Sequence, residues 1–348
     1  MTALAFDSPT TWQATARSAR GTSHQRTGAP NQDSGRTAVV RDGSAVVLAV
    51  ADGHGDPLHA RSDRGSRFAV EAAIELLTGW ITAKPGSDDA IYSSAAELPQ
   101  KLVDAWRAKV ASDLDADPPR HQAAQLASSR NAELIEQSPE ILYGSTLVAA
   151  AIDGRLALYV QIGDGDLLTL APDGAVRRAV PASGDLPLHI TESLCQADAR
   201  DRFRVQVEFF AKRPLPALVM ASTDGYSNSF RDDTAFLKVA SDLKAYLERN
   251  GIEWIAQHLE GWLDETSKNG SGDDITLAMA WLANREKRRR RPLPLLLVIA
   301  AVLVLLVPIG WGAWTLAPAG FREQAQEIWQ RLSGNAQPEP TSEPDYTK

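Results

Sequence analysis

The sequence predicts an α+β fold, in which two antiparallel β-sheets form layers flanked by helix pairs, followed by one transmembrane helix. The first observation is the order of the elements: strands, a helical block, more strands, two helices and a last strand. This order differs from the regular βαβ alternation of parallel sheets. The second observation is a long apolar stretch near the C-terminus that holds no charged residue.

Several apolar runs, many of them β-branched and most closed by Gly, Asp or Pro, predict the strands. They are Ala45–Ala51, Ser145–Ile152, Leu156–Ile162, Phe203–Phe210, Ala217–Ser222 and Ile275–Trp281. Asp153-Gly154 and Asp173-Gly174 lie between such runs and predict hairpin turns. Residues 155–170 followed by Val176–Val180 therefore predict consecutive antiparallel strands.

Apolar residues at helical spacing predict the helices between these strands. In Ser66–Ile81, for example, Phe68, Ala72, Leu76 and Leu77 share one face. The other predicted helices are Leu98–Leu114, His121–Ile135, Thr234–Leu247 and Gly251–Glu265.

Charge and cysteine content limit the function classes. The formal net charge of −8 argues against a general nucleic-acid-binding surface. The single cysteine, Cys195, excludes an internal disulfide and fits a reducing compartment. No glycine-rich anion-binding loop follows Cys195, so we interpret it as structural.

The uncharged stretch Pro292–Pro318 predicts a transmembrane helix over 292–317, because about 20 apolar residues cross the hydrocarbon core. Trp311 and Trp314 lie toward its far end, which is typical of the lipid–water boundary. The basic run Lys287–Arg291 precedes it and should stay cytoplasmic. No signal peptide is evident at the N-terminus. We therefore expect a single-pass protein of the cytoplasmic membrane, with its N-terminal domain facing the cytoplasm.

Aspartates recur beside glycine or another small residue near the ends of the predicted strands. They are Asp33, Asp52, Asp164, Asp224 and Asp273. Asp-Gly pairs are common in turns, and for the two hairpin pairs named above that interpretation suffices. If the strands lie side by side, however, these five carboxylates meet at one end of the sheets.

Clustered carboxylates repel each other and favour bound cations. All-oxygen ligands suit Mg²⁺ or Mn²⁺, and Gly53 would leave its carbonyl oxygen accessible to a metal beside Asp52. Two ions about 3.5–4 Å apart can hold a phosphate and activate a water for in-line attack. His54, two residues beyond Asp52, could protonate the leaving alkoxide as general acid.

Six short motifs, in this order, resemble the metal-dependent protein phosphatases of the type 2C superfamily, especially compact bacterial members. They are Asn31-Gln32-Asp33, Asp52-Gly53-His54-Gly55, Gly144-Ser145-Thr146, Gly163-Asp164-Gly165-Asp166, Thr223-Asp224-Gly225 and Gly272-Asp273-Asp274-Ile275-Thr276. The resemblance covers about residues 20 to 282. It implies a β-sandwich flanked by helix pairs, and hydrolysis of phosphoserine and phosphothreonine in proteins with two Mn²⁺ or Mg²⁺ ions and a third, weaker one.

The resemblance also implies roles for single residues. Asp52 would bridge two metal ions, and the Gly53 carbonyl would bind one of them. Asp224 and Asp273 match the other direct metal ligands. Asp33 matches the outer aspartate that holds metal-bound waters, and Asp164 matches one that helps to bind the third ion.

The sequence departs from the family pattern at three places. Gly28 stands where many members have an arginine that binds the substrate phosphate, and the nearest cations are Arg26 and His24, which we assign to this role. Asp166 replaces the arginine of a frequent Gly-Asp-Ser-Arg motif. Asn228 stands where many members have a second carboxylate for the third ion.

Three functions fit the sequence. The first is an active protein serine/threonine phosphatase, favoured by the Asp52, Asp224 and Asp273 set. The second is a membrane-anchored pseudophosphatase that acts as a binding module, favoured by the missing arginine. The third is a phosphohydrolase of small molecules, and turnover of a phosphopeptide against a small ester would separate it from the first.

The predicted domains follow from these features. Residues 1–284 form the catalytic domain, 285–291 a basic juxtamembrane segment, 292–317 the transmembrane helix and 318–348 a short, partly disordered tail. The anchor suggests a phosphorylated protein substrate at or near the membrane. The sequence does not determine the oligomeric state.

Overall fold

Ten strands form two five-stranded sheets in the part of the chain that the structure, a computed structural model, describes: residues 10–83, 86–119, 129–181 and 192–284. Sheet A has the order β1-β10-β9-β6-β7, with β1 at Thr10–Ala19, β10 at Ile275–Asn284, β9 at Leu218–Ser222, β6 at Asp166–Leu170 and β7 at Val176–Arg178. Sheet B has the order β2-β3-β4-β5-β8, with β2 at Ser34–Val40, β3 at Ala45–Ala51, β4 at Leu147–Asp153, β5 at Leu156–Ile162 and β8 at Arg204–Phe209. Sheet B is antiparallel throughout, as is the β10-β9-β6-β7 part of sheet A.

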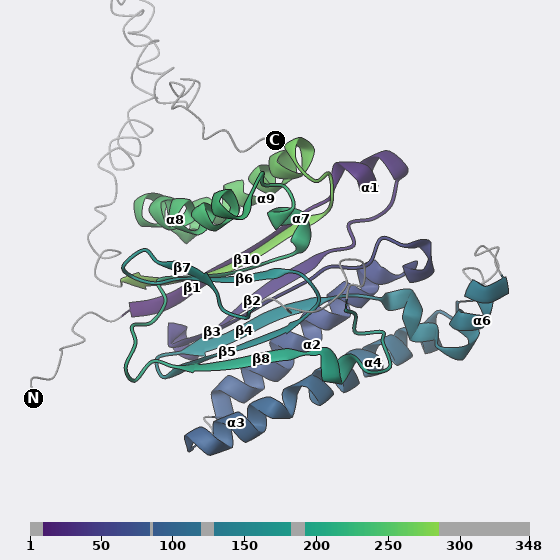
Figure 1. Ribbon diagram of the computed structural model, residues 1–348, viewed down its shortest axis with the longest axis horizontal. Helices are drawn as coiled ribbons and strands as arrows, with labels where there is room; N and C mark the ends of the chain where they lie inside the picture. The colour runs from purple at the N-terminus through teal and green to yellow at the C-terminus, as the bar shows by residue number, and fades with distance from the viewer. Residues whose placement is uncertain (1–9, 84–85, 120–128, 182–191, 285–348) are drawn as a thin grey trace, which may run out of the picture. The chain divides into compact units, whose positions relative to one another are not determined.

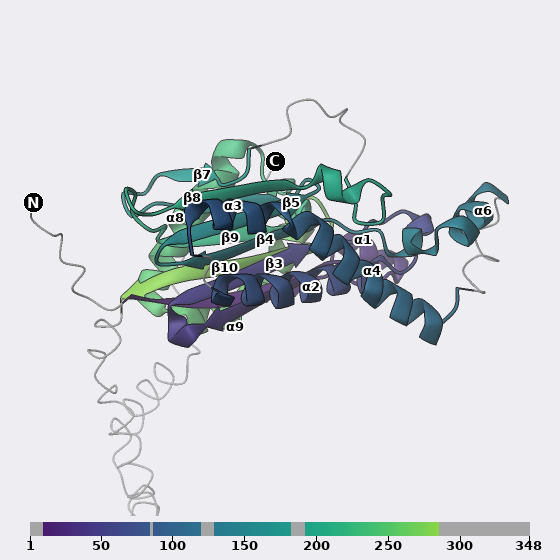
Figure 2. The ribbon, with the colours of Figure 1, turned by 90° about the horizontal axis from the view of Figure 1, so that it is seen from below.

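Helices cover the outer face of each sheet (Figure 1). Sheet B is covered by α2 at Ser62–Ala83, α3 at Asp88–Ala96 and α4 at Leu98–Ala116, which lie in front of the sheets in Figure 2. Sheet A is covered by α8 at Asp233–Asn250 and α9 at Ile252–Asn269. Shorter helices are α1 at Thr22–Thr27, α6 at Ser129–Gln137 and α7 at Asp224–Ser227. The predicted layers are therefore confirmed, with α3 in addition.

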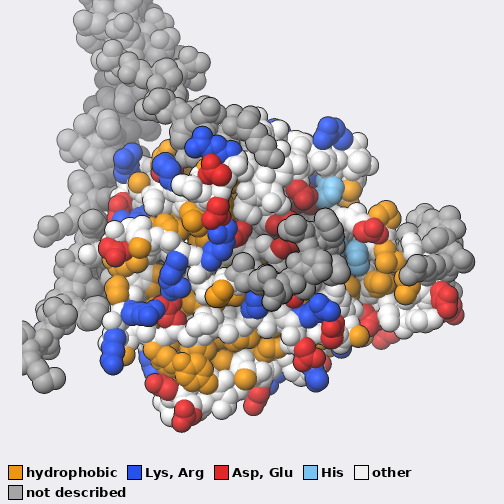
Figure 3. Space-filling model, in the orientation of Figure 1, with side chains coloured by type: hydrophobic (Ala, Val, Ile, Leu, Met, Phe, Trp, Pro, Cys, Tyr) orange, Lys and Arg blue, Asp and Glu red, His pale blue; other side chains and the backbone are white. Residues whose placement is uncertain are grey.

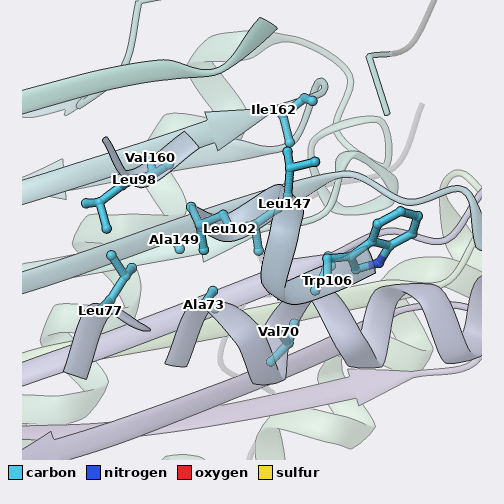
Figure 4. Close-up of a cluster of buried hydrophobic side chains, with 14 of the residues drawn as sticks. Val70, Ala73, Leu77, Leu98, Leu102, Trp106, Leu147, Ala149, Val160 and Ile162 are labelled. Carbon is cyan, nitrogen blue, oxygen red and sulfur yellow. The ribbon is translucent and has the colours of Figure 1, made fainter. Parts of the chain in front are cut away.

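Three apolar clusters hold the layers together. One lies between the sheets, and the other two lie between each sheet and its helices. Strand β3 shows why its sequence is apolar at every position: Val46, Leu48 and Val50 face sheet A, whereas the alternate alanine and valine residues face α2. Figure 4 shows the cluster between sheet B and its helices, where Leu102 and Trp106 of α4 pack near β4 and β5.

Most predicted strands and helices are confirmed within a few residues at each end. The predicted antiparallel pairing across Asp173-Gly174 is confirmed between β6 and β7. The predicted run 155–170 is divided into β5 and β6, which belong to different sheets because the chain passes from sheet B to sheet A at Gly163–Gly165. Strands β1 and β2 were missed because both are half-buried and carry polar residues, which dilute the apolar alternation.

Several predictions fall outside the described residues. They concern the basic segment 285–291, the transmembrane helix 292–317, the tail 318–348 and the first part of the predicted helix His121–Ile135. Within the described ranges, no helix is long and apolar enough to cross a membrane.

Candidate metal centre

The strand register brings the predicted aspartates to one end of the two sheets. In sheet B, Ser34 pairs with Ala51, which places Asp33 and Asp52 side by side. In sheet A, Ser222 of β9 pairs with both Leu277 of β10 and Asp166 of β6, which brings Asp224, Asp273 and Asp164 to the same end of that sheet. Figure 3 shows acidic and histidine side chains gathered at the end of the molecule where Figure 1 places α1.

A hydrogen bond joins the two sheets at this end. The Thr223 hydroxyl, just after β9, donates to Asp33 Oδ2 at 2.7 Å, and the Thr276 backbone N–H of β10 donates to the same hydroxyl at 2.9 Å. Asp33 is buried, so its carboxylate needs such partners. The acid cluster, defined here as Asp33, Asp52, Asp224 and Asp273, therefore draws on both sheets.

The pKa values show that the four carboxyls sense each other. Burial raises the pKa of Asp52 well above its usual range, and the nearby Asp33, Asp224 and Asp273 raise it further. Burial, followed by the charge of Asp164, raises the pKa of Asp224 to about 6. Burial also raises the pKa values of Asp33 and Asp273, and Asp274 adds to both. The cluster is thus a set of mutually repelling groups that favours a cation.

Unpaired atoms and close packing test whether divalent ions suit this cluster. Asp33 Oδ1 and Asp224 Oδ1 are buried without a hydrogen-bond partner among the described residues. A Cβ on Gly53 would lie 2.6 Å from the backbone oxygens of Gln32 and Ser62, so only glycine allows this backbone position beside Asp52. Oxygen-only donors fit Mn²⁺ or Mg²⁺. As they stand, however, no three His, Cys, Asp or Glu side chains in the described ranges are arranged to hold a metal ion.

His54 is partly buried beside a second histidine, whereas a general acid needs surroundings that keep its ring protonated. Its ring centroid is 4.9 Å from that of His59, at an angle of 62°. Burial, and then the neighbouring His59, lower the pKa of His54 to about 4. The imidazole is therefore neutral near pH 7 and would have to gain a proton before acting as an acid. Its role as general acid stays a prediction.

The two predicted phosphate-binding side chains both lie on α1 but differ in their surroundings. His24 Nδ1 lies 2.9 Å from Asp274 Oδ2, within ion-pair distance but out of line for a hydrogen bond. Arg26 is exposed, and its Nε donates to the backbone oxygen of Thr22 at 3.2 Å. Of the two, His24 is therefore held beside the acid cluster.

Asp164 and Asn228 bear on the predicted third ion. Asp164 is exposed in the turn between β5 and β6, and its charge helps to raise the pKa of Asp224. Asn228 Nδ2 donates to Asp224 Oδ2 at 3.0 Å, so this amide is turned toward the acid cluster. An amide carries no negative charge, so of the two positions considered for the third ion only Asp164 offers a carboxylate.

Two residues at this end were not predicted. His59 lies against His54, and its Nδ1 contacts the Ile141 carbonyl oxygen. Asp274 is buried and accepts hydrogen bonds from the Gly21 and Gln32 backbone N–H groups, both at 2.6 Å. No spacing signal pointed to the hydrogen-bond partners of either residue, because Ile141, Gly21 and Gln32 lie far from them along the chain.

No curated protein matches the chain. Among solved structures, the chain is similar to the serine/threonine phosphatase Stp1 from Staphylococcus aureus, with 14% identity, 82% of this chain and 100% of that chain covered, and a TM-score of 0.49. It is also similar to the Mycobacterium tuberculosis serine/threonine phosphatase PstP/Ppp, with 18% identity, 79% and 100% coverage, and a TM-score of 0.45. It is similar as well to the catalytic domain of the serine/threonine protein phosphatase PstP in complex with two manganese ions. Here the identity is 21%, the match covers 79% of this chain and 100% of that chain, and the TM-score is 0.45.

The family comparison covers most of the chain. Residues 20–264 match the family described as Protein phosphatase 2C. This range contains Asp33, Asp52, Asp164 and Asp224 and ends shortly before Asp273. The two stacked sheets, the flanking helices and the acid cluster at their shared end agree with this match, and the chain belongs to the protein phosphatase 2C family.

Proposed function

We propose that this chain is a metal-dependent protein serine/threonine phosphatase whose acid cluster holds Mn²⁺ or Mg²⁺. The observation that carries the proposal is the meeting of four carboxyls with raised pKa values at one end of two sheets. Carboxyl groups with such raised pKa values cluster at functional sites, and bound cations that take part in phosphate chemistry would offset their mutual repulsion. A purely structural cluster would gain stability by losing these charges.

The residues present would divide the work as follows. Asp52, Asp224 and Asp273, with the Gly53 carbonyl, would hold the ions, and Asp33 would position water beside them. When bound, the ions would neutralise these carboxylates, hold the phosphate and lower the pKa of an attacking water. Thr223 keeps the Asp33 carboxyl in place through its 2.7 Å hydrogen bond, which fixes the geometry between the sheets.

Phosphate release from a phosphothreonine peptide tests the proposal. We would assay the full-length chain in detergent with Mn²⁺, with Mg²⁺ and with EDTA. We expect metal-dependent release that Asp52→Asn abolishes. Asp173→Asn removes the same charge from the hairpin between β6 and β7 and should leave the activity unchanged. A folded protein without activity in either metal would instead favour the binding-module function. Turnover of a small phosphate ester alone would favour the small-molecule hydrolase.

We also propose that residues 292–317 anchor the chain in the cytoplasmic membrane, with the phosphatase domain on the cytoplasmic side. The support is the uncharged apolar stretch and the basic run Lys287–Arg291 before it. Its substrate would then be a phosphoprotein near the membrane. Cell fractionation tests this: the full chain should sediment with membranes and a chain lacking 286–348 should not. A full chain in the soluble fraction would refute the anchor.

A further inference from the structure

A cavity opens at the end of sheet B away from the acid cluster. Its volume is about 330 Å³, and it is lined by Arg41, Ser44, Trp80, Ile81, Asp153, Gly154, Arg155 and Leu156. Ala45 pairs with Asp153 beside it, whereas Gly53 pairs with Ser145 at the acid cluster. Eight residue steps along extended chain lead from Ala45 to Gly53, or about 26 Å. Helix α3 contributes Asp88, which pairs with Arg155 of the cavity lining, and in Figure 1 α3 lies at the lower left whereas α1 lies at the upper right.

The cavity combines cationic and apolar surfaces. Its lining holds two guanidinium groups, those of Arg41 and Arg155, against one carboxylate, that of Asp153. Trp80, Ile81 and Leu156 supply the apolar wall, and the Trp80 indole N–H is already engaged with Ser94 Oγ at 2.9 Å. A volume of this size matches the lower range of small-molecule sites, which are mainly apolar with a few placed polar groups.

Both arginines of the cavity lining stand in ion pairs. Arg41 Nη2 lies 3.0 Å from Asp153 Oδ2, and Arg155 Nη2 lies 2.7 Å from Asp88 Oδ1. Arg41 Nε, however, is buried and has no hydrogen-bond partner among the described residues. A buried donor without an acceptor is costly, and a rotation of the partly exposed Arg41 side chain toward a bound anion would supply the missing acceptor.

The backbone at the cavity rim is strained in a way that presents Arg41. Arg41 and Asp42 have φ values of 50° and 53°, and they are followed by Gly43 at 88°. Residues with a Cβ rarely adopt this left-handed region, and such positions recur at ligand sites. Arg41 thus lines the cavity from a backbone position in the left-handed region.

We propose that this cavity binds a small organic anion, with its carboxylate or phosphate held by Arg41 and its apolar part against Trp80. The guanidinium group can donate two parallel hydrogen bonds to either kind of oxyanion. The apolar wall selects a ligand with a ring or a short hydrocarbon portion. This site is separate from the acid cluster and does not depend on the proposed phosphatase activity.

Calorimetric titration of the full-length chain with 2-naphthoate tests the site. We expect saturable binding of one molecule, and at least tenfold weaker binding of 2-naphthylmethylamine, which has the same ring with a positive charge. Asp52→Asn should bind 2-naphthoate as the wild type does, because the acid cluster lies at the other end. Absence of saturable binding, equal binding of the amine, or loss of binding in Asp52→Asn would each overturn the proposal.

A matched pair of variants isolates the guanidinium group. Arg41→Gly and Asp42→Gly relieve the same kind of backbone strain, but only the first removes the cation from the cavity. We expect Arg41→Gly to weaken 2-naphthoate binding at least tenfold and Asp42→Gly to leave it within twofold. Arg41→Gln, which keeps the strain, should behave like Arg41→Gly. Unchanged binding in both Arg41 variants, with the proteins shown to be folded, would refute the assignment of Arg41.

Discussion

Replacing Asp224 by asparagine should stabilise the metal-free protein. Burial and the charge of Asp164 raise the pKa of Asp224 to about 6, against about 3.9 in an unfolded chain. A difference of about 2 pKa units corresponds to about 3 kcal/mol at neutral pH. The charge of Asp224 also helps to raise the pKa of Asp52, and asparagine removes that charge. We therefore expect Asp224→Asn to raise the free energy of unfolding by about 2–3 kcal/mol. The hydrogen bond from Asn228 Nδ2 can still be accepted by the amide oxygen.

The sign of the effect depends on pH and on metal. Since the folded pKa of Asp224 is raised, the penalty is fully present above about pH 6 and disappears as the pH falls from about 6 to about 4. The gain from Asp224→Asn should therefore be large in EDTA at pH 7.5 and small at pH 4.5. With saturating Mn²⁺ the order should reverse, because bound ions stabilise the wild type by mass action.

Thermal unfolding of both proteins, in EDTA and in Mn²⁺ at each pH, measures this. Asp173→Asn serves as the control, since it removes a carboxylate that caps a turn far from the cluster. A lower Tm for Asp224→Asn than for the wild type in EDTA at pH 7.5 would refute the repulsion on which the metal centre rests. An equal rise in Tm for Asp173→Asn would show that the stabilisation comes from the change in net charge and not from the acid cluster.

Three further predictions concern packing and reactivity. Gly53→Ala should abolish metal-dependent activity and lower the Tm, because its Cβ would lie 2.6 Å from backbone oxygens. Gly79→Ala adds a Cβ with nothing within 4 Å inside helix α2, so it should leave the activity unchanged and raise the Tm slightly. Trp106→Ala should lower the free energy of unfolding by about 3–5 kcal/mol, measured by denaturant titration, since the side chain is fully buried and donates to a backbone oxygen; a loss below about 1 kcal/mol would contradict the packing. Burial raises the pKa of Cys195, so iodoacetamide at pH 8.5 should modify the native protein much more slowly than the unfolded one, and equal rates measured by mass spectrometry would contradict this burial.

The sequence alone determined most of the fold, because its signals are local. Strands β3, β4 and β5 are continuous apolar runs between turn residues, and they form where the pattern predicts them. Helices α8 and α9 follow the apolar spacing of their buried faces. The five aspartates at strand ends were also readable, since each stands beside glycine or a small residue next to such a run.

Tertiary structure decided what depends on residues distant along the chain. The partners of Asp33 and Asp274 lie 190 and 253 residues away, so no local pattern could name Thr223 or Gly21. The separation of β5 from β6 into different sheets likewise reflects packing rather than propensity. The sequence thus specified which groups could act together, because residue type and strand ends are local properties. Only the stacking of two sheets set their distances and pKa values, because burial and electrostatic fields arise from the whole fold.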